Sequence, residues 1–139
     1  MTETLHAEHA RLREHLEHVG LAARELPGLS GEERRQVVSR ILEFLRGTLI
    51  PHAEDEERGL YARVAELLGD ERAIAPMIYD HRAICEYVDE LEVAAGLDDV
   101  HRLQQLLYAL EALIEVHFRK EEELYLPLVD ALWLSGPRS

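Results

Sequence analysis

Four long stretches of the chain repeat apolar residues at intervals of three and four, which is the spacing of one face of an α-helix. Turn-forming residues separate them, among them Pro27-Gly28, Gly69-Asp70 and Gly96-Leu97-Asp98-Asp99. Ser30, with Glu33 three residues later, has the pattern of a capping box at the start of the second stretch. The expected helices cover about residues 3–26, from Ser30 to Gly69, from between Asp70 and Pro76 to Ala95, and from Asp99 to about Trp133.

The loops between these helices are short, and short loops join helices that lie antiparallel to each other. The pattern therefore predicts an all-α fold, an up-down-up-down antiparallel four-helix bundle. At 139 residues the chain is long enough for one domain with a buried core. We expect this domain to cover residues 1–134 and the tail at 135–139 to be disordered.

Polar residues interrupt each apolar stripe at one place, and all of them are histidines or glutamates. Two stretches read His-x-x-x-Glu-Glu, and residues four apart lie on the same face of a helix. Each stretch therefore directs an imidazole and a carboxylate into the core together. The inward-facing polar residues are His9 on the first helix, His52 and Glu56 on the second, His81 on the third, and His117 and Glu121 on the fourth.

The positions of these histidines along their helices place them at a common level. His9 lies 18 residues before Pro27, and His52 lies 22 residues after Ser30. The second pair of helices repeats this difference of four residues, about one helical turn. There is also a loose internal repeat, because residues 8–14 resemble residues 80–86 and the two His-x-x-x-Glu-Glu stretches resemble each other. The four histidines should meet near one end of the bundle.

A single histidine on an apolar stripe is more often a core residue with satisfied hydrogen bonds than a metal ligand. Four at one level, with two carboxylates that are costly to bury unpaired, favour a metal site instead. Imidazole and carboxylate ligands suit iron, manganese or zinc better than calcium or magnesium. The set does not follow the Glu-x-x-His pattern of ferritin-like bundles.

Two ions fit these six ligands. His9 and His52 would bind one ion, and His81 and His117 the other. Glu56 and Glu121 would each bridge the pair, which leaves positions for an oxo, hydroxo or small exogenous ligand. The remaining histidines, His6, His15, His18 and His101, fall beside the stripes and are expected on the surface. Glu57 and Glu122 point away from the inward glutamates and are expected to contact the ligands from outside or to be solvated.

At this point the chain resembles the hemerythrins, and among them the bacterial hemerythrin-like proteins with an H, HxxxE, H, HxxxE pattern. The motif residues named above carry the resemblance, which spans nearly all of the chain. It implies a four-helix bundle around a non-haem di-iron centre that reacts with dioxygen or related small oxidants.

One position departs from the oxygen-carrying hemerythrins, which have a fifth histidine four residues after the third. Here that residue is Cys85. A thiolate could bind iron, but a buried neutral cysteine is the commoner case. Tyr125, four residues after Glu121, is the second candidate for tuning the centre, either as a phenol beside the ligands or as a packed core residue. The missing histidine favours peroxide or nitric oxide as a ligand over reversible oxygen carriage.

The charge and the cysteine content limit the kinds of partner and the cellular compartment that we expect. With 15 basic and 28 acidic residues the formal net charge is −13, which argues against nucleic acid and anionic membranes as partners. One cysteine excludes an internal disulfide, and no apolar run has membrane-spanning length, so we expect a cytoplasmic protein. The sequence does not indicate the oligomeric state.

Two classes of function stay open at this stage. The first is an enzyme that turns over peroxide, in the manner of a catalase or peroxidase, or nitric oxide at the di-iron site. The second is a protein that binds or senses oxygen or iron without turnover. Both have small molecules as partners.

Overall fold

The computed structural model of the chain describes residues 2–135, and the side chains of residues 3–131. Every regular element over residues 2–135 is helical. The α-helices are α1 (Thr2–Glu25), α2 (Gly31–Phe44), α3 (Ile50–Glu56), α4 (Ala62–Leu68), α5 (Ala75–Gly96), α6 (Val100–Lys120) and α7 (Leu126–Ser135). The short turns are the 3-10 turns η1 (Leu26–Gly28) and η4 (Glu71–Ala73) and the π-helical turns η2 (Leu45–Leu49), η3 (Glu57–Tyr61) and η5 (Glu121–Tyr125).

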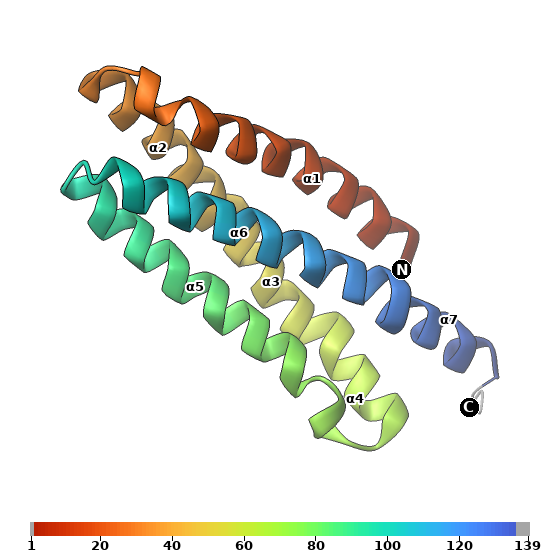
Figure 1. Ribbon diagram of the computed structural model, residues 1–139. Helices are drawn as coiled ribbons and strands as arrows, with labels where there is room; N and C mark the ends of the chain where they lie inside the picture. The colour runs from red at the N-terminus through yellow and green to blue at the C-terminus, as the bar shows by residue number, and fades with distance from the viewer. Residues whose placement is uncertain (1, 136–139) are drawn as a thin grey trace.

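Figure 1 shows these elements as long rods that lie side by side. α1 and α5 each form one rod, α2 to α4 form another, and α6 and α7 form the last. The connections between rods alternate between the two ends, which is the arrangement expected when short loops join neighbouring helices. The all-helical bundle predicted from the sequence is therefore confirmed. The tail predicted at 135–139 lies outside the described residues, except for Ser135 at the end of α7.

The ends of the helices form where the sequence indicates. Ser30 accepts a hydrogen bond from the Glu33 amide (3.2 Å), and the Glu33 carboxylate accepts one from the Ser30 amide (3.0 Å), so the capping box is complete. Asp99 caps α6 by accepting from the Arg102 amide, and Pro76 lies in the first turn of α5, where no amide donor is needed.

The second rod changes its hydrogen bonding just before Pro51. The amide of Ile50 donates to the Leu45 carbonyl, five residues back, and closes the π-helical turn η2. Proline has no amide hydrogen and cannot continue the ladder of bonds four residues apart. The backbone nevertheless stays helical, with φ −62° and ψ −45° at Ile50. The rod therefore accommodates Pro51 through a π-helical turn and remains continuous.

The apolar core consists of two clusters of buried side chains. The larger one fills the bundle from the η1 end to Phe118 and includes Leu26, Leu45 and Leu110. The smaller one lies around α4 and α7 and includes Leu60, Met77 and Leu126. Five buried polar side chains, His9, Glu56, His81, His117 and Glu121, belong to neither cluster.

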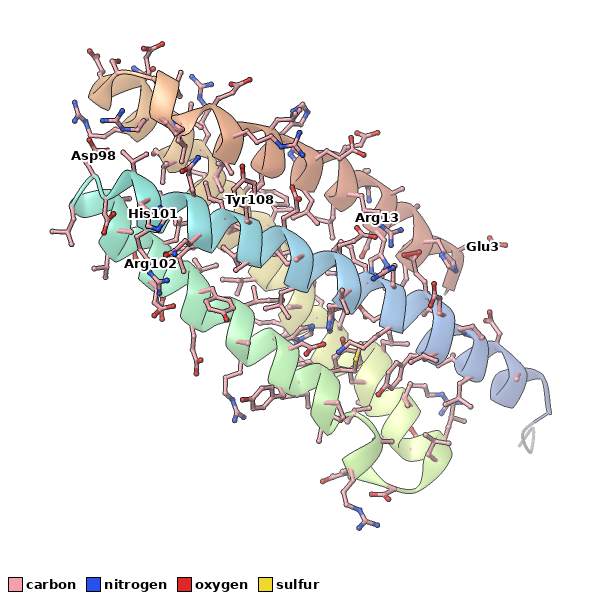
Figure 2. All side chains as sticks on the ribbon, viewed as in Figure 1. Glu3, Arg13, Asp98, His101, Arg102 and Tyr108 are labelled. Atoms are coloured by element: carbon pink, nitrogen blue, oxygen red, sulfur yellow. The ribbon has the colours of Figure 1, made fainter. Side chains whose placement is uncertain are left out.

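Ion pairs and exposed polar residues occupy the outside. Figure 2 shows Asp98, His101 and Arg102 near the connection between α5 and α6. Asp98 accepts hydrogen bonds from Arg34 of α2 (3.0 and 2.8 Å), which ties that connection to the second rod. The four histidines expected on the surface, His6, His15, His18 and His101, are all exposed. Over the described residues, none of the helices combines the length and the apolar character needed to span a bilayer.

Candidate metal centre

Four rods bring the six inward polar residues to one place. His9 comes from α1, His52 and Glu56 from α3, and His81 from α5. His117 lies on α6, and Glu121 opens η5. Residue exposures are at most 5% for the five buried members, and the His52 side chain is 10% exposed.

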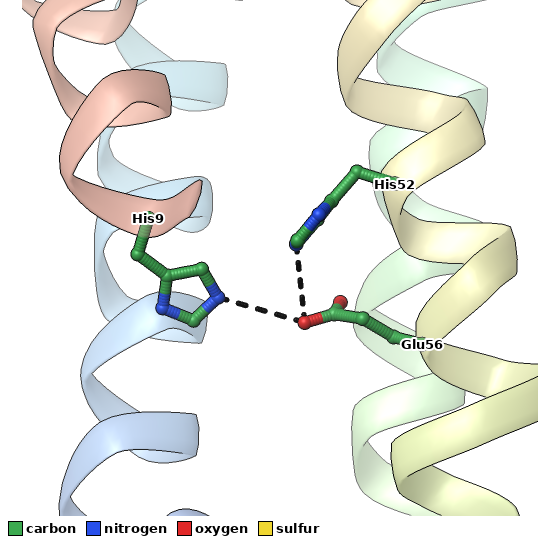
Figure 3. Close-up of side chains that lie close together, drawn as sticks. All are labelled: His9, His52 and Glu56. Atoms are coloured by element: carbon green, nitrogen blue, oxygen red, sulfur yellow. Dashed lines mark ion pairs between the residues drawn. The ribbon is translucent and has the colours of Figure 1, made fainter. Parts of the chain in front are cut away.

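Around His9 and His52 the inner atoms converge on one carboxylate oxygen, as Figure 3 shows. Nε2 of His9 lies 3.5 Å from Oε2 of Glu56, and Nε2 of His52 lies 3.2 Å from the same oxygen. His9 Nε2 is also 3.6 Å from Oε1 of Glu121. One nitrogen from each of two helices therefore faces a shared oxygen, and these three side chains are close enough to hold one metal ion.

Around His81 and His117 a second group forms. Nε2 of His81 lies 3.3 Å from Oε1 of Glu56, and Nε2 of His117 lies 3.1 Å from Oε1 of Glu121. The two Nε2 atoms are 3.0 Å apart. Glu56, His81 and His117 are also close enough to hold a metal ion, so Glu56 belongs to both groups through different oxygens.

The chemistry of the inner atoms fits metal ions. His9 Nε2, His52 Nε2, both oxygens of Glu56 and Oε1 of Glu121 are buried without a hydrogen-bond partner. Buried polar atoms are costly when they lack partners, and a carboxylate costs more than a neutral group. Imidazole nitrogens and carboxylate oxygens are the donors that iron, manganese and zinc bind. Metal binding by these residues stays a prediction, and the geometry suits it.

A carboxylate also lies at the outer nitrogen of each histidine. Glu8 Oε2 is 3.0 Å from Nδ1 of His52, and Asp80 Oδ2 is 2.8 Å from Nδ1 of His117. Glu8 and Asp80 each precede a ligand candidate by one residue, yet each contacts the histidine of the next helix in its own hairpin. Such contacts fix the ring so that Nε2 faces a metal. Their role was missed in the sequence, although both belong to the internal repeat.

The glutamates that follow the inward pair serve the remaining histidines. Glu57 Oε2 is 3.3 Å from Nδ1 of His81, and Glu122 Oε1 is 3.7 Å from Nδ1 of His9. Arg13 of α1, seen in Figure 2, holds Glu122 by an ion pair of 2.6 Å. Each acidic residue thus reaches the histidine of the other hairpin. Of the two sequence expectations for these glutamates, the outer contact to the ligands is the one observed.

Electrostatics distinguish the two inner carboxylates. Burial opposes the ionisation of Glu56, but the neighbouring imidazoles of His52, His81 and His9 outweigh it and lower its pKa. Burial raises the pKa of Glu121 to about 7, the neighbouring imidazole of His117 opposes this rise, and the neighbouring Glu56 adds to it. Two carboxylates this close favour one proton between them in the absence of a cation.

Two of the imidazoles have raised pKa values for a related reason. Burial lowers the pKa of His52, but the nearby carboxylate of Glu56 outweighs burial and raises it. At His117 burial is likewise outweighed by the nearby carboxylate of Glu121, and the pKa is raised. Metal must displace these protons, because only neutral imidazole binds.

A tyrosine missed in the sequence closes one side of the site. The hydroxyl of Tyr61 lies 2.9 Å from His117 Nε2 and 3.3 Å from His81 Nε2, and it donates to Glu121 Oε2 at 3.2 Å. The residue is fully buried, and burial together with the charges of Glu56 and Glu121 raises the pKa of the phenol. The hydroxyl therefore stays protonated at neutral pH.

Of the two roles considered for Tyr125, packing is the one observed, because its side chain lies against the smaller apolar cluster. Its hydroxyl donates to the carbonyl of Ala73 (2.7 Å), and the side chain is only partly buried. The cause is the π-helical turn η5, in which residues five apart replace residues four apart as neighbours on one face. Leu126, five residues after Glu121, is buried in its place. By the same rule Tyr61, five residues after Glu56, reaches the site through η3.

Cys85 lies outside both groups of candidate ligands among the described residues. It is partly buried, and desolvation together with the charges of Asp89, Glu54 and Glu57 raises the pKa of its thiol. A raised pKa keeps the thiol neutral, and a thiol must lose its proton to bind a metal.

A layer of imidazoles and carboxylates in the core of a helix bundle is typical of the class of proteins that bind metal ions inside such a bundle. The comparison with family models places the chain within that class. It belongs to the hemerythrin HHE cation-binding domain family, whose model matches residues 1–129. No curated protein and no solved structure matches the chain.

Proposed function

We propose that the protein is a non-haem di-iron protein that binds or reacts with dioxygen, peroxide or nitric oxide. The observation that carries this proposal is the convergence of buried, unpartnered donor atoms on two neighbouring points, with Glu56 shared between them. Family membership supports a cation at this place. Iron would supply redox and Lewis-acid chemistry when bound.

The residues have separate tasks in this proposal. His9 and His52 would hold one ion, His81 and His117 would hold the other, and Glu56 and Glu121 would supply carboxylate oxygens to both. The outer carboxylates keep the imidazole rings oriented, as the 2.8 Å contact between Asp80 and His117 illustrates. The two apolar clusters pack on either side of the layer.

Tyr61 gives the His81–His117 side a hydrogen-bond donor. Its hydroxyl is held protonated by its raised pKa, and it contacts both Nε2 atoms of that side. A small oxidant bound on that side could accept a hydrogen bond from this phenol. Over the described residues, no comparable hydroxyl contacts His9 or His52.

Metal analysis of iron-loaded protein tests the proposal. We expect about two ions per chain and an optical spectrum that differs from that of free iron. Well under one ion per chain would rule the proposal out. His15→Ala serves as a control, because His15 is exposed and stacks on Phe44 away from the layer.

Peroxide added to the loaded protein separates turnover from binding. Oxygen evolution over many cycles would identify an enzyme of the catalase kind. A single stoichiometric colour change would identify a binding or sensing protein. The same experiment with nitric oxide, followed by its consumption, tests the remaining candidate substrate.

A further inference from the structure

One surface pocket reaches the candidate ligands. It has a volume of about 740 Å³ and lies between the start of α1 and the segment from α3 to α4. His52 and Glu56 form part of its wall. Four further pockets over the described residues are lined by none of the six candidate ligands.

The inner wall of this pocket offers an unsatisfied metal-binding group. The Glu56 side chain is 2% exposed, and neither of its oxygens has a hydrogen-bond partner. A buried metal site needs an entry path, because the ion arrives hydrated from the solvent. The opposite, His81–His117 side is covered by the buried ring of Tyr61. The pocket therefore connects solvent to the His9–His52 side.

The rim of the pocket favours a cation. Glu8 and Asp55 line it with side-chain exposures of 36% and 75%. Glu8 contacts His52 Nδ1, and Asp55 forms an ion pair with Arg58 (2.6 Å), which is not part of the wall. The one basic residue in the wall, Arg63, forms an ion pair with Glu66 (3.3 Å). Carboxylates at a partly enclosed mouth raise the local concentration of divalent cations.

We propose that this pocket is the route by which ferrous iron enters and leaves the bundle core, with Glu8 and Asp55 concentrating the ion before His52 and Glu56 bind it. The inference rests on the proposed di-iron function. It adds a task for residues that are not themselves expected ligands, namely Glu8, Asp55 and Gly59.

A larger side chain at the position of Gly59 would fill part of the pocket. It lies in the wall within η3, and a Cβ built on it meets no atom within 4 Å. Gly47 is a matched control, since it is also exposed, lies in the π-helical turn η2 and has the same open space, but lines none of the five pockets described. Leucine favours helix more than glycine does, so both substitutions suit the backbone.

The experiment follows the loss of ferrous iron from the loaded protein to an excess of a coloured ferrous chelator. Gly59→Leu should slow the first phase of release about tenfold, as a barrier higher by about 1.4 kcal/mol would. Gly47→Leu should stay within about twofold of the wild-type protein. Equal rates in the two variants would overturn the route. A wild-type protein that holds no iron would instead overturn the proposed function.

Two variants that each remove one negative charge provide a second test, which does not depend on whether the glycine variants fold. Asp55→Asn should slow release about twofold at low ionic strength, because an ion passing the rim loses one attractive charge. Glu54→Gln, an exposed neighbour that is absent from the pocket wall, makes the same change in net charge and should have no such effect. Identical rates in these two variants would overturn the role of the rim.

Discussion

The stretches from His52 to Tyr61 and from His117 to Leu126 carry the same features in the same order. Each has a histidine, a glutamate four residues later and a π-helical turn at or directly after the glutamate. They differ five residues after the glutamate. Tyr61 directs a hydroxyl at two imidazoles, whereas Leu126 packs in the smaller apolar cluster.

The two halves of the chain repeat the same candidate ligands but differ in the groups that surround them. Both halves supply a histidine from a single rod and a His-x-x-x-Glu pair from the next, with acidic residues at equivalent places around them. One half of the layer is nevertheless closed by a phenol, and the other borders a pocket. We therefore expect two similar ion positions with unequal chemistry.

The largest effect is expected from Glu56→Gln, which changes the carboxylate shared by both groups. The amide has one neutral oxygen and cannot bridge two cations, so iron content should fall from about two ions per chain to below one. Iron at a thousand times its dissociation constant stabilises the wild-type fold by about 4 kcal/mol, and this gain should disappear in the variant. Thermal unfolding with and without chelator measures it.

Glu54→Gln provides the reference for that measurement, since Glu54 is exposed on the same helix. If Glu56→Gln kept two ions and an unchanged spectrum, the bridging role would be wrong. If only one ion were lost, Glu56 would belong to one position alone.

A smaller effect is expected when an outer carboxylate is removed. Asp80→Asn and Glu8→Gln each take a charge from the Nδ1 atom of one histidine, His117 and His52 respectively. Metal affinity at the corresponding position should fall about tenfold. Competition against a chelator of known affinity measures this change. Lys120 also forms an ion pair with Asp80, so a variant of Lys120 is needed to separate the loss of that pair from the loss of the contact to His117.

The comparison between the halves is sharpened by Tyr61→Phe, which removes the hydroxyl and keeps the ring. The iron-loaded variant should retain two ions but show a shifted spectrum, because the contact to His81 and His117 is lost. Tyr125→Phe removes a hydroxyl that is bonded to the Ala73 carbonyl and should leave the spectrum unchanged. The reverse result would mean that the phenol facing the loaded centre is Tyr125.

On the last rod the sequence was a reliable guide up to Glu121 and failed directly after it. A period of 3.6 residues predicted the burial of Leu106, Leu110, His117 and Glu121, and these residues are buried. Continued past Glu121, the same period points to Tyr125 and Leu128, where the structure buries Leu126 and Val129 instead. The π-helical turn η5 shifts the stripe by one residue.

The same limit explains why Tyr61 was missed. Nothing in an apolar pattern marks a turn whose bonds span five residues, because its stability comes from surrounding contacts as much as from its own residues. Pro51 directly follows η2 and accounts for the altered hydrogen bonding there, but no proline lies within η3. Glu8 and Asp80 belong to the internal repeat of the sequence. The histidines that they contact lie on other helices, so only the folded structure shows these contacts.

The smallest effect is expected from Cys85→Ser. The thiol occupies the position at which oxygen-carrying hemerythrins would have a further histidine, but it belongs to neither group of candidate ligands among the described residues. Its raised pKa, caused by desolvation and by nearby acidic residues, keeps it protonated. Iron content, optical spectrum and peroxide reactivity should therefore match those of the wild-type protein. Loss of an absorption band in the variant would show that the thiolate binds iron in the loaded protein, and it would make the His81–His117 side differ from the other side by two residues rather than one.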